Sequence, residues 1–195
     1  MKIDYGESAR HDGVMHARTA LSFAVLMAAA ACGADGPAPG TIRVEPYALQ
    51  GREGAMLGGS SAMAVRVQYT GSRPWRELAV TSIDAQGKQT RRDLGASKAA
   101  AAEGTVVESD AVACVSLHEL TVDAQKHSLL TVHVAHRGGD TLSARAIVDD
   151  LLPSPRSGMG TTAGPTTEVA EDQPVVLWRT TFAGGGELRV ELTMR

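Results

Sequence analysis

Apolar and polar residues alternate along several segments of this chain, with the period of two that is typical of a β-strand with one buried and one solvated side. The segment 61–70, SAMAVRVQYT, shows the alternation most clearly, because Met63, Val65, Val67 and Tyr69 all fall on one side. The same alternation predicts strands at 41–47, 128–136 and 187–194, and a less regular one predicts strands at 77–84, 105–108, 111–122, 141–148 and 175–182.

Glycine-containing segments separate these strands at 85–88, 136–140 and 183–186, where glycine can adopt the positive φ that tight turns need. The last two segments are predicted to close hairpins. No segment carries a sustained helical stripe, although SKAAAA at 97–102 could form one or two helical turns. About eight or nine short strands without a βαβ rhythm indicate an all-β fold, an antiparallel β-sandwich of the immunoglobulin-like or a related type.

The strand pattern also predicts the domain organisation. Residues 41–195 are expected to form a single sandwich domain, and the segment 153–174 is expected to be a long loop because it is poor in large apolar residues. The segment 71–75 is a short connection that ends in Trp75. The side chains expected to face the core are Val65, Val67, Tyr69, Val132, Val134, Leu188, Val190 and Leu192.

The first part of the chain has a different character. Residues 21–31 contain no charge over eleven positions, which is too short for a membrane span of about 20 residues but matches the apolar region of a signal peptide. Arg18 precedes this region, and small residues occupy positions 29–31 directly before Cys32. Ala-Ala-Ala-Cys at 29–32, preceded by Leu26, resembles the lipobox of bacterial lipoproteins.

The resemblance implies that residues 1–31 are removed and that the thiol and new amino group of Cys32 are acylated. Residues 32–40 would then be a flexible tether. Ala29 stands where the family prefers leucine, so secretion without lipid is the alternative. Acidic residues within 1–14 favour Met15 as the true start, and Gly33 rather than aspartate after Cys32 favours the outer membrane.

Composition narrows the function classes. The residues are 43% hydrophobic and 21% charged, as in ordinary globular domains. The net charge is −3 and no basic cluster is longer than Arg91–Arg92, so nucleic acid is not an expected partner. The two cysteines are too few for a disulfide framework or a four-cysteine zinc site. Once Cys32 carries lipid, Cys114 has no partner, and we expect it to be a buried packing thiol.

Cys114 and His118 have the spacing of a candidate copper pair, and the arrangement faintly resembles that of cupredoxins. No histidine lies between residues 17 and 117, and no methionine lies between His118 and Met159, so no metal site is assigned. His118-Glu119 begins like the zinc-protease motif, but Val122 replaces the second histidine. His133 and His136 are three residues apart on a predicted strand and should point to opposite sides.

The remaining motifs carry no chemistry. The glycines at 158–164 lack the spacing of a dinucleotide site, and no Gly-x-Ser-x-Gly elbow is present. The sequence therefore predicts a lipid-anchored envelope lipoprotein that faces the periplasm or the cell surface. Its domain is expected to be a non-enzymatic interaction or structural module without a cofactor, bound to the membrane through Cys32 and available to a protein partner. The alternative is a small envelope metal-binding or enzymatic domain that uses Cys114, His118, His133 and His136.

Overall fold

Nearly all regular structure in the described residues is β. The computed structural model describes residues 36–49, 62–98, 105–137, 141–152 and 159–195, and the predicted lipobox at 29–32 lies outside these ranges. Within them, no helix is long and apolar enough to span a bilayer. The elements are β1 (Thr41–Tyr47), β2 (Met63–Gly71), β3 (Trp75–Ile83), β4 (Gln89–Lys98), β5 (Val107–Val122), β6 (Gln125–His136), β7 (Thr141–Ile147), the 3₁₀ turn η2 (Asp149–Leu151), β8 (Met159–Ala163), β9 (Thr167–Ala170), β10 (Val175–Phe182) and β11 (Glu187–Met194).

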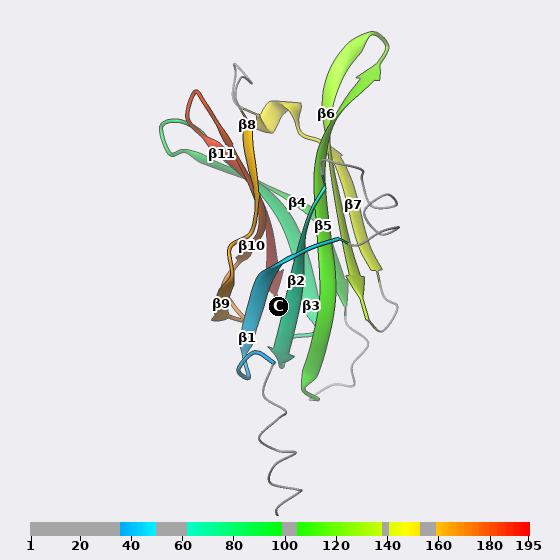
Figure 1. Cartoon of the computed structure of the whole chain (residues 1–195), viewed down its shortest axis with the longest axis vertical. Coiled ribbons are helices and arrows are strands. Elements are labelled where there is room, and N and C mark those ends of the chain that lie inside the picture. The colour runs from blue at the N-terminus through cyan, green and yellow to red at the C-terminus, as the bar shows by residue number, and fades with distance from the viewer. Residues whose placement is uncertain (1–35, 50–61, 99–104, 138–140, 153–158) are drawn as a thin grey trace, which may run out of the picture. The chain divides into compact units, whose positions relative to one another are not determined.

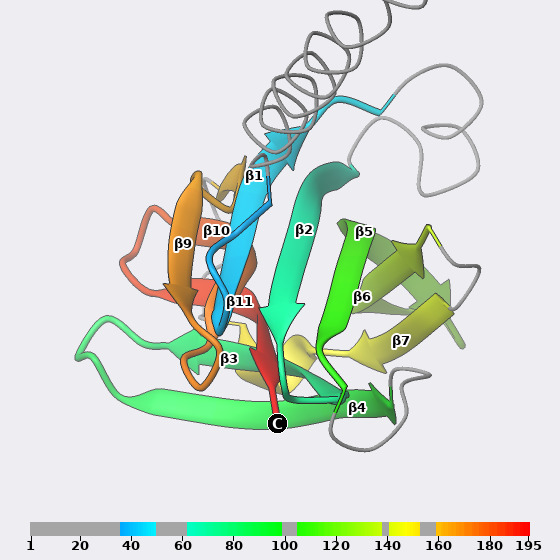
Figure 2. The same ribbon diagram turned by 90° about the horizontal axis from the view of Figure 1, so that it is seen from below.

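The strands form two sheets that face each other (Figures 1 and 2). The six-stranded sheet has the order β7-β6-β5-β2-β1-β9, and the five-stranded sheet has the order β4-β3-β11-β10-β8. Every neighbouring pair is antiparallel. Pro37–Arg195 form one compact unit. The predicted antiparallel β-sandwich is therefore confirmed, and the described residues contain eleven strands rather than the expected eight or nine.

The core between the sheets consists of the side chains that the alternation placed inward. All eight predicted core residues are buried, and all eight belong to the main hydrophobic cluster. The largest side chain in this cluster is Trp178, which is 1% exposed. Because each strand alternates, the residues between these positions point away from the other sheet. We call the side of a sheet that carries the core residues its inner side, and the opposite side its outer side.

Three edge strands, β4, β8 and β9, were not predicted from the sequence. The loop expected at 153–174 instead contains β8 and β9. The helical turns expected at 97–102 are also wrong where they can be checked, because Ser97 and Lys98 end β4, while residues 99–102 lie outside the described part. Each of these three strands pairs with one neighbour only and has few buried residues, so its sequence lacks the apolar alternation.

The segments 105–108 and 111–122 were predicted as two strands, but β5 runs unbroken from Val107 to Val122. The two polar residues Ser109 and Asp110 interrupt the apolar alternation in the sequence. In the structure Asp110 lies on the outer side and pairs with Arg66, so the strand continues through it. The hairpin predicted at 183–186 is confirmed, with Gly185 and Gly186 at φ +84° and +94°. β6 and β7 are also antiparallel neighbours, as expected for the hairpin at 136–140.

Candidate functional site: the arm, the entry end and the outer face

The hairpin of β5 and β6 is longer than the strands beside it. β2 pairs with β5 only as far as Val115, and β7 pairs with β6 only from Leu129 onward. Beyond these points β5 and β6 pair only with each other, up to Val122 opposite Gln125. We call residues 119–127 the arm, and Figure 1 shows it extending past the other strands. Residues 119–126 are all exposed and therefore accessible to another molecule.

The arm reverses the distribution of apolar residues. In the body of β5, the inner side carries Ala113 and Val115, which are buried in the core. In the arm, the same side carries Glu119, which forms an ion pair of 2.6 Å with Lys126. The pairing of β5 with β6 has no register shift, so this reversal belongs to the sequence and not to a bulge. The apolar residues of the arm are Leu120 and Val122, and they lie on the outer side, 40% and 43% exposed.

A two-residue turn closes the arm. Asp123 and Ala124 have φ of 50° and 61°, the left-handed values of a type I′ hairpin turn. Aspartate tolerates this region, whereas alanine adopts it at a cost of about 1 kcal/mol. This turn was not predicted from the sequence, because it contains no glycine. A fixed two-residue turn sets the register of the arm and holds Leu120 and Val122 on one side.

The opposite end of the sandwich is where the chain enters the domain, and we call it the entry end. The Gly40 N–H donates to the Thr70 carbonyl at 2.6 Å, directly before β1 starts. Two large apolar side chains are exposed near this point, Trp75 at 48% and Val106 at 66%. Figure 2 shows the sandwich from this end. Lys98 Nζ lies 5.9 Å from the centre of the Trp75 ring, a cation–π distance.

A buried hydrogen-bond group holds the chain at the entry end. The Tyr69 hydroxyl donates to Glu171 Oε2 at 2.7 Å and accepts from the Arg73 N–H at 2.8 Å. Burial and the Glu171 carboxylate raise the pKa of Tyr69 to about 12, and the Tyr69 hydrogen bond lowers the pKa of Glu171. The Glu171 N–H donates to the Gly40 carbonyl at 2.8 Å. Gly71 is required beside this group, because a Cβ there would overlap Tyr69 and Glu171.

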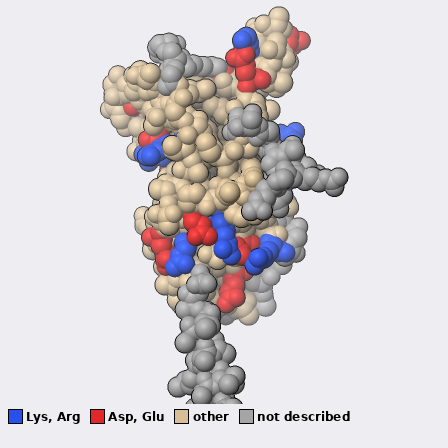
Figure 3. All heavy atoms as spheres, in the orientation of Figure 1, with Lys and Arg blue, Asp and Glu red and all other residues tan. Residues whose placement is uncertain are grey.

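The outer face of the six-stranded sheet carries a row of paired charges. Asp110 accepts from Arg66 Nε and Nη2, both at 2.9 Å, and it lies 3.3 Å from Arg137 Nη1. Arg66 also lies 3.5 Å from Glu45. The hydrogen bond from Arg66 lowers the pKa of Asp110. Figure 3 shows acidic and basic groups alternating across this face, and their mutual pairing makes the row locally neutral.

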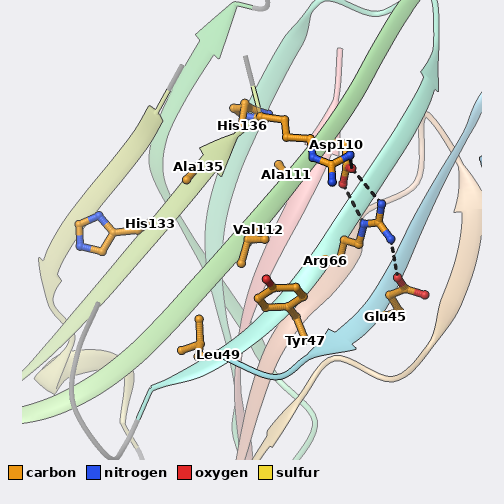
Figure 4. A pocket seen from close by; sticks show the side chains of 11 residues that line it. Glu45, Tyr47, Leu49, Arg66, Asp110, Ala111, Val112, His133, Ala135 and His136 are labelled. Atoms are coloured by element: carbon orange, nitrogen blue, oxygen red, sulfur yellow. Dashed lines mark hydrogen bonds and ion pairs between the residues drawn. The ribbon is translucent and has the colours of Figure 1, made fainter. Parts of the chain in front are cut away.

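A hollow of about 420 Å³ lies beside this row (Figure 4). Val112 and Ala135 are short side chains at its centre, while Tyr47 and His133 are larger residues at its sides. His133 Nδ1 is 2.8 Å from Ser143 Oγ. The hollow therefore combines an apolar floor with polar sides, but its charged groups already satisfy one another. This arrangement suits sheet stability as well as it suits a ligand.

Of the four cysteine and histidine candidates, the structure brings only Cys114 and His133 side by side. Cys114 and His118 both lie on the outer side of β5, four residues and therefore about 13 Å apart along the strand. His133 pairs directly with Cys114 across the sheet, and His136 lies on the inner side, as the three-residue spacing predicted. Arg76 Nη1 donates to His136 Nε2 at 2.9 Å, so Nδ1 carries the proton toward Ser109. Among the described residues, no three histidine, cysteine or acidic side chains form a metal-binding group.

Cys114 is buried and free, as predicted. It is 2% exposed, and burial raises the pKa of its thiol. It lies on the outer side of β5, between Ala64 and His133 on the neighbouring strands. The core residue next to it, Val115, points to the opposite side. A protonated thiol among packed neighbours is a poor nucleophile, which argues against a reactive site there.

A search of protein-family models, of curated proteins and of solved structures found no match to this chain.

Proposed function

We propose that this protein is a lipid-anchored component of the bacterial cell envelope, whose sandwich domain binds a protein partner and catalyses no reaction. The lipobox-like residues 29–32 support the anchor at Cys32, and the segment 32–40 supports a tether between lipid and domain. The domain would face the periplasm or the cell surface, and Gly33 favours the outer membrane. The metal-binding alternative is not adopted, because only Cys114 and His133 lie side by side, and His118 and His136 do not join them to complete a ligand set.

One observation carries the interaction role: the arm exposes Leu120 and Val122 while it places its ion pair on the other side. Residues on the inner side of the arm have no opposite sheet to pack against, so polar residues are suitable there. The apolar residues on the outer side, Leu120 and Val122, keep 40% and 43% of their surface exposed in the monomer. Exposed apolar residues that are aligned on one side of a strand are typical of a surface that another molecule covers.

The position of the anchor argues for a protein as that molecule. Glu108 pairs with Thr70 at the entry end, and Val122 lies fourteen positions further along β5. At about 3.3 Å per residue, the tip of the arm lies about 45 Å from the entry end. A bilayer that holds Cys32 lies beside the entry end. The arm would therefore present Leu120 and Val122 away from that bilayer, toward another envelope protein.

The anchor is tested by intact-mass analysis and membrane fractionation of the full chain produced in bacteria. The expected mature protein starts at Cys32, carries two or three acyl chains and sediments with membranes, since one chain alone binds only marginally. Cys32→Ala should be released or remain unprocessed. An unlipidated chain that is cut at another position would contradict the anchor.

The arm is tested in cells with a photoreactive amino acid. Placed at position 120, it is expected to give one discrete adduct with a protein, and the added substitution Val122→Asp should abolish that adduct. The matched control places the same amino acid at position 121, on the other side of β5, where the adduct should be several-fold weaker. Equal adduct formation at both positions, or an adduct that Val122→Asp leaves unchanged, would overturn the role of this side of the arm.

A further inference from the structure

We propose that the entry end of the domain makes its own contact with the bilayer that holds Cys32, and that Trp75 is the side chain that enters the lipid headgroup boundary. This inference rests on the proposed lipid anchor and adds a second, non-covalent membrane contact to it. The contacting group consists of Trp75, Val106 and Lys98.

Several backbone contacts place this group beside the point where the chain enters. Val107, the neighbour of Val106, pairs with Gly71 at the end of β2, next to Thr70, which holds Gly40. Trp75 pairs with Lys98 across β3 and β4. Trp75 also exchanges two backbone hydrogen bonds of 2.8 Å with Arg195, so its backbone is fixed on both sides. The exposed indole is thus presented from a rigid strand and not from a loop.

The chemistry of the group suits a lipid boundary. Tryptophan combines a large apolar ring with a polar N–H and is enriched where membrane meets water. Val106 is the most exposed of the large apolar side chains in the described chain. The apolar stem of a lysine can lie along such a surface while its ammonium group stays at the level of the phosphates. Lys98, above the Trp75 ring, is in position to do this.

The short segment between Cys32 and β1 also supports the bilayer as the surface that this group contacts. Eight residues, Gly33–Gly40, separate Cys32 from β1. Fully extended, they span at most about 28 Å, so an acylated Cys32 keeps the entry end near the membrane surface. Tethering of this kind gives a weak contact a high effective concentration. A contact too weak to recruit the domain from solution can therefore form in the anchored protein.

Charge contributes little to this contact. The nearby basic residues Arg73 and Arg195 are paired with Glu171 at 3.3 Å and with Glu77 at 2.7 Å. The whole chain carries a net charge of −3. We therefore expect contact with a zwitterionic phosphatidylcholine surface, and we expect added salt to leave it unchanged.

The test uses the intrinsic fluorescence of the full lipidated protein in vesicles. The chain has two tryptophans, and Trp178 is 1% exposed in the core, so a lipid-borne quencher should reach Trp75 alone. In vesicles of brominated phosphatidylcholine, the wild-type protein should lose emission relative to unbrominated vesicles. The loss should disappear in Trp75→Phe. In Trp178→Phe, where the structure gives the replaced indole N–H no hydrogen-bond partner, nearly all emission should become quenchable.

Two results would overturn the inference, and they can be told apart. A chain that is shown by mass to be acylated and that floats with the vesicles, but whose Trp75 emission is unquenched, would overturn the contact alone. A chain without acyl groups would overturn the anchor and this contact together. The Cys32→Ala protein in the same vesicles gives the reference, and its quenching should be several-fold weaker, because the tether no longer holds the entry end at the surface.

Discussion

The two ends of the sandwich both expose apolar side chains, but they do so in different ways. At the entry end, Trp75 and Val106 lie where strands begin, beside the cation of Lys98. In the arm, Leu120 and Val122 lie on one side of a regular strand, with an ion pair on the other side. The first arrangement is irregular and amphipathic, which suits a fluid lipid boundary. The second has the fixed spacing of a strand, which suits a protein surface of defined shape.

The same comparison can be made within β5 between the body of the strand and its arm. Val115 and Val122 are the same residue type on one strand, but Val115 is buried in the core and Val122 is exposed. Val115→Asp should lower the free energy of unfolding by at least about 4 kcal/mol, because it buries an unpaired charge. Val122→Asp should change it by less than about 0.5 kcal/mol. Urea unfolding measures both values. If Val115→Asp does not fold, Val115→Ala replaces it, with an expected loss of about 2 kcal/mol in the free energy of unfolding.

Comparable losses from Val115→Asp and Val122→Asp would contradict the distinction. They would mean that the arm is packed within the monomer, and the case for a partner surface there would fail.

The body of the sandwich could be predicted from the sequence, because one buried side per strand produces alternation. Val67 and Val190 follow that rule and are buried as expected. The edge strand β8 could not be predicted, because none of its side chains is buried. Its backbone pairs with a neighbouring strand whatever the side chains are, so its sequence has no apolar alternation. Cys114 was expected to be a buried packing thiol and is one, but only the strand register shows that it lies on the outer side, opposite His133.

The sequence alone did not show which side of a strand the residues of the two exposed regions occupy, or that they are exposed. Leu120 and Val122 look like the continuation of an apolar strand, and only the uninterrupted pairing of β5 with β6 shows that they have changed sides. Trp75 was interpreted as the end of an ordinary connection. Its significance depends on its exposure beside the chain entry, which depends on contacts between residues far apart in the sequence.

A smaller effect is expected at the entry end, from the Tyr69 hydroxyl. Its hydrogen bond lowers the pKa of Glu171 below the ordinary value of 4.5. The stabilisation from the Glu171 carboxylate is therefore complete above that ordinary pKa and is lost as the pH falls through the lower folded-state pKa. Tyr69→Phe should cost about 1–2 kcal/mol at neutral pH and less at acid pH, measured by urea unfolding at both.

Tyr47→Phe is the matched control, because the Tyr47 side chain points to the outer hollow and away from this group. It should change stability little and equally at both pH values. A Tyr69→Phe loss that is the same at neutral and acid pH would show that the hydroxyl acts without the Glu171 charge.

The smallest effect is expected at the turn of the arm. Ala124 holds a φ of 61°, which glycine adopts without the steric cost that a Cβ imposes. Ala124→Gly should raise the free energy of unfolding by less than about 1 kcal/mol, because glycine gains in the turn but loses more entropy on folding. Asp123→Gly should gain less, since aspartate already tolerates this region. Because the register is preserved, adduct formation from position 120 should be unchanged in Ala124→Gly. A changed adduct with unchanged stability would instead show that the partner contacts the turn itself, and it would extend the binding surface from the side of the arm to its tip.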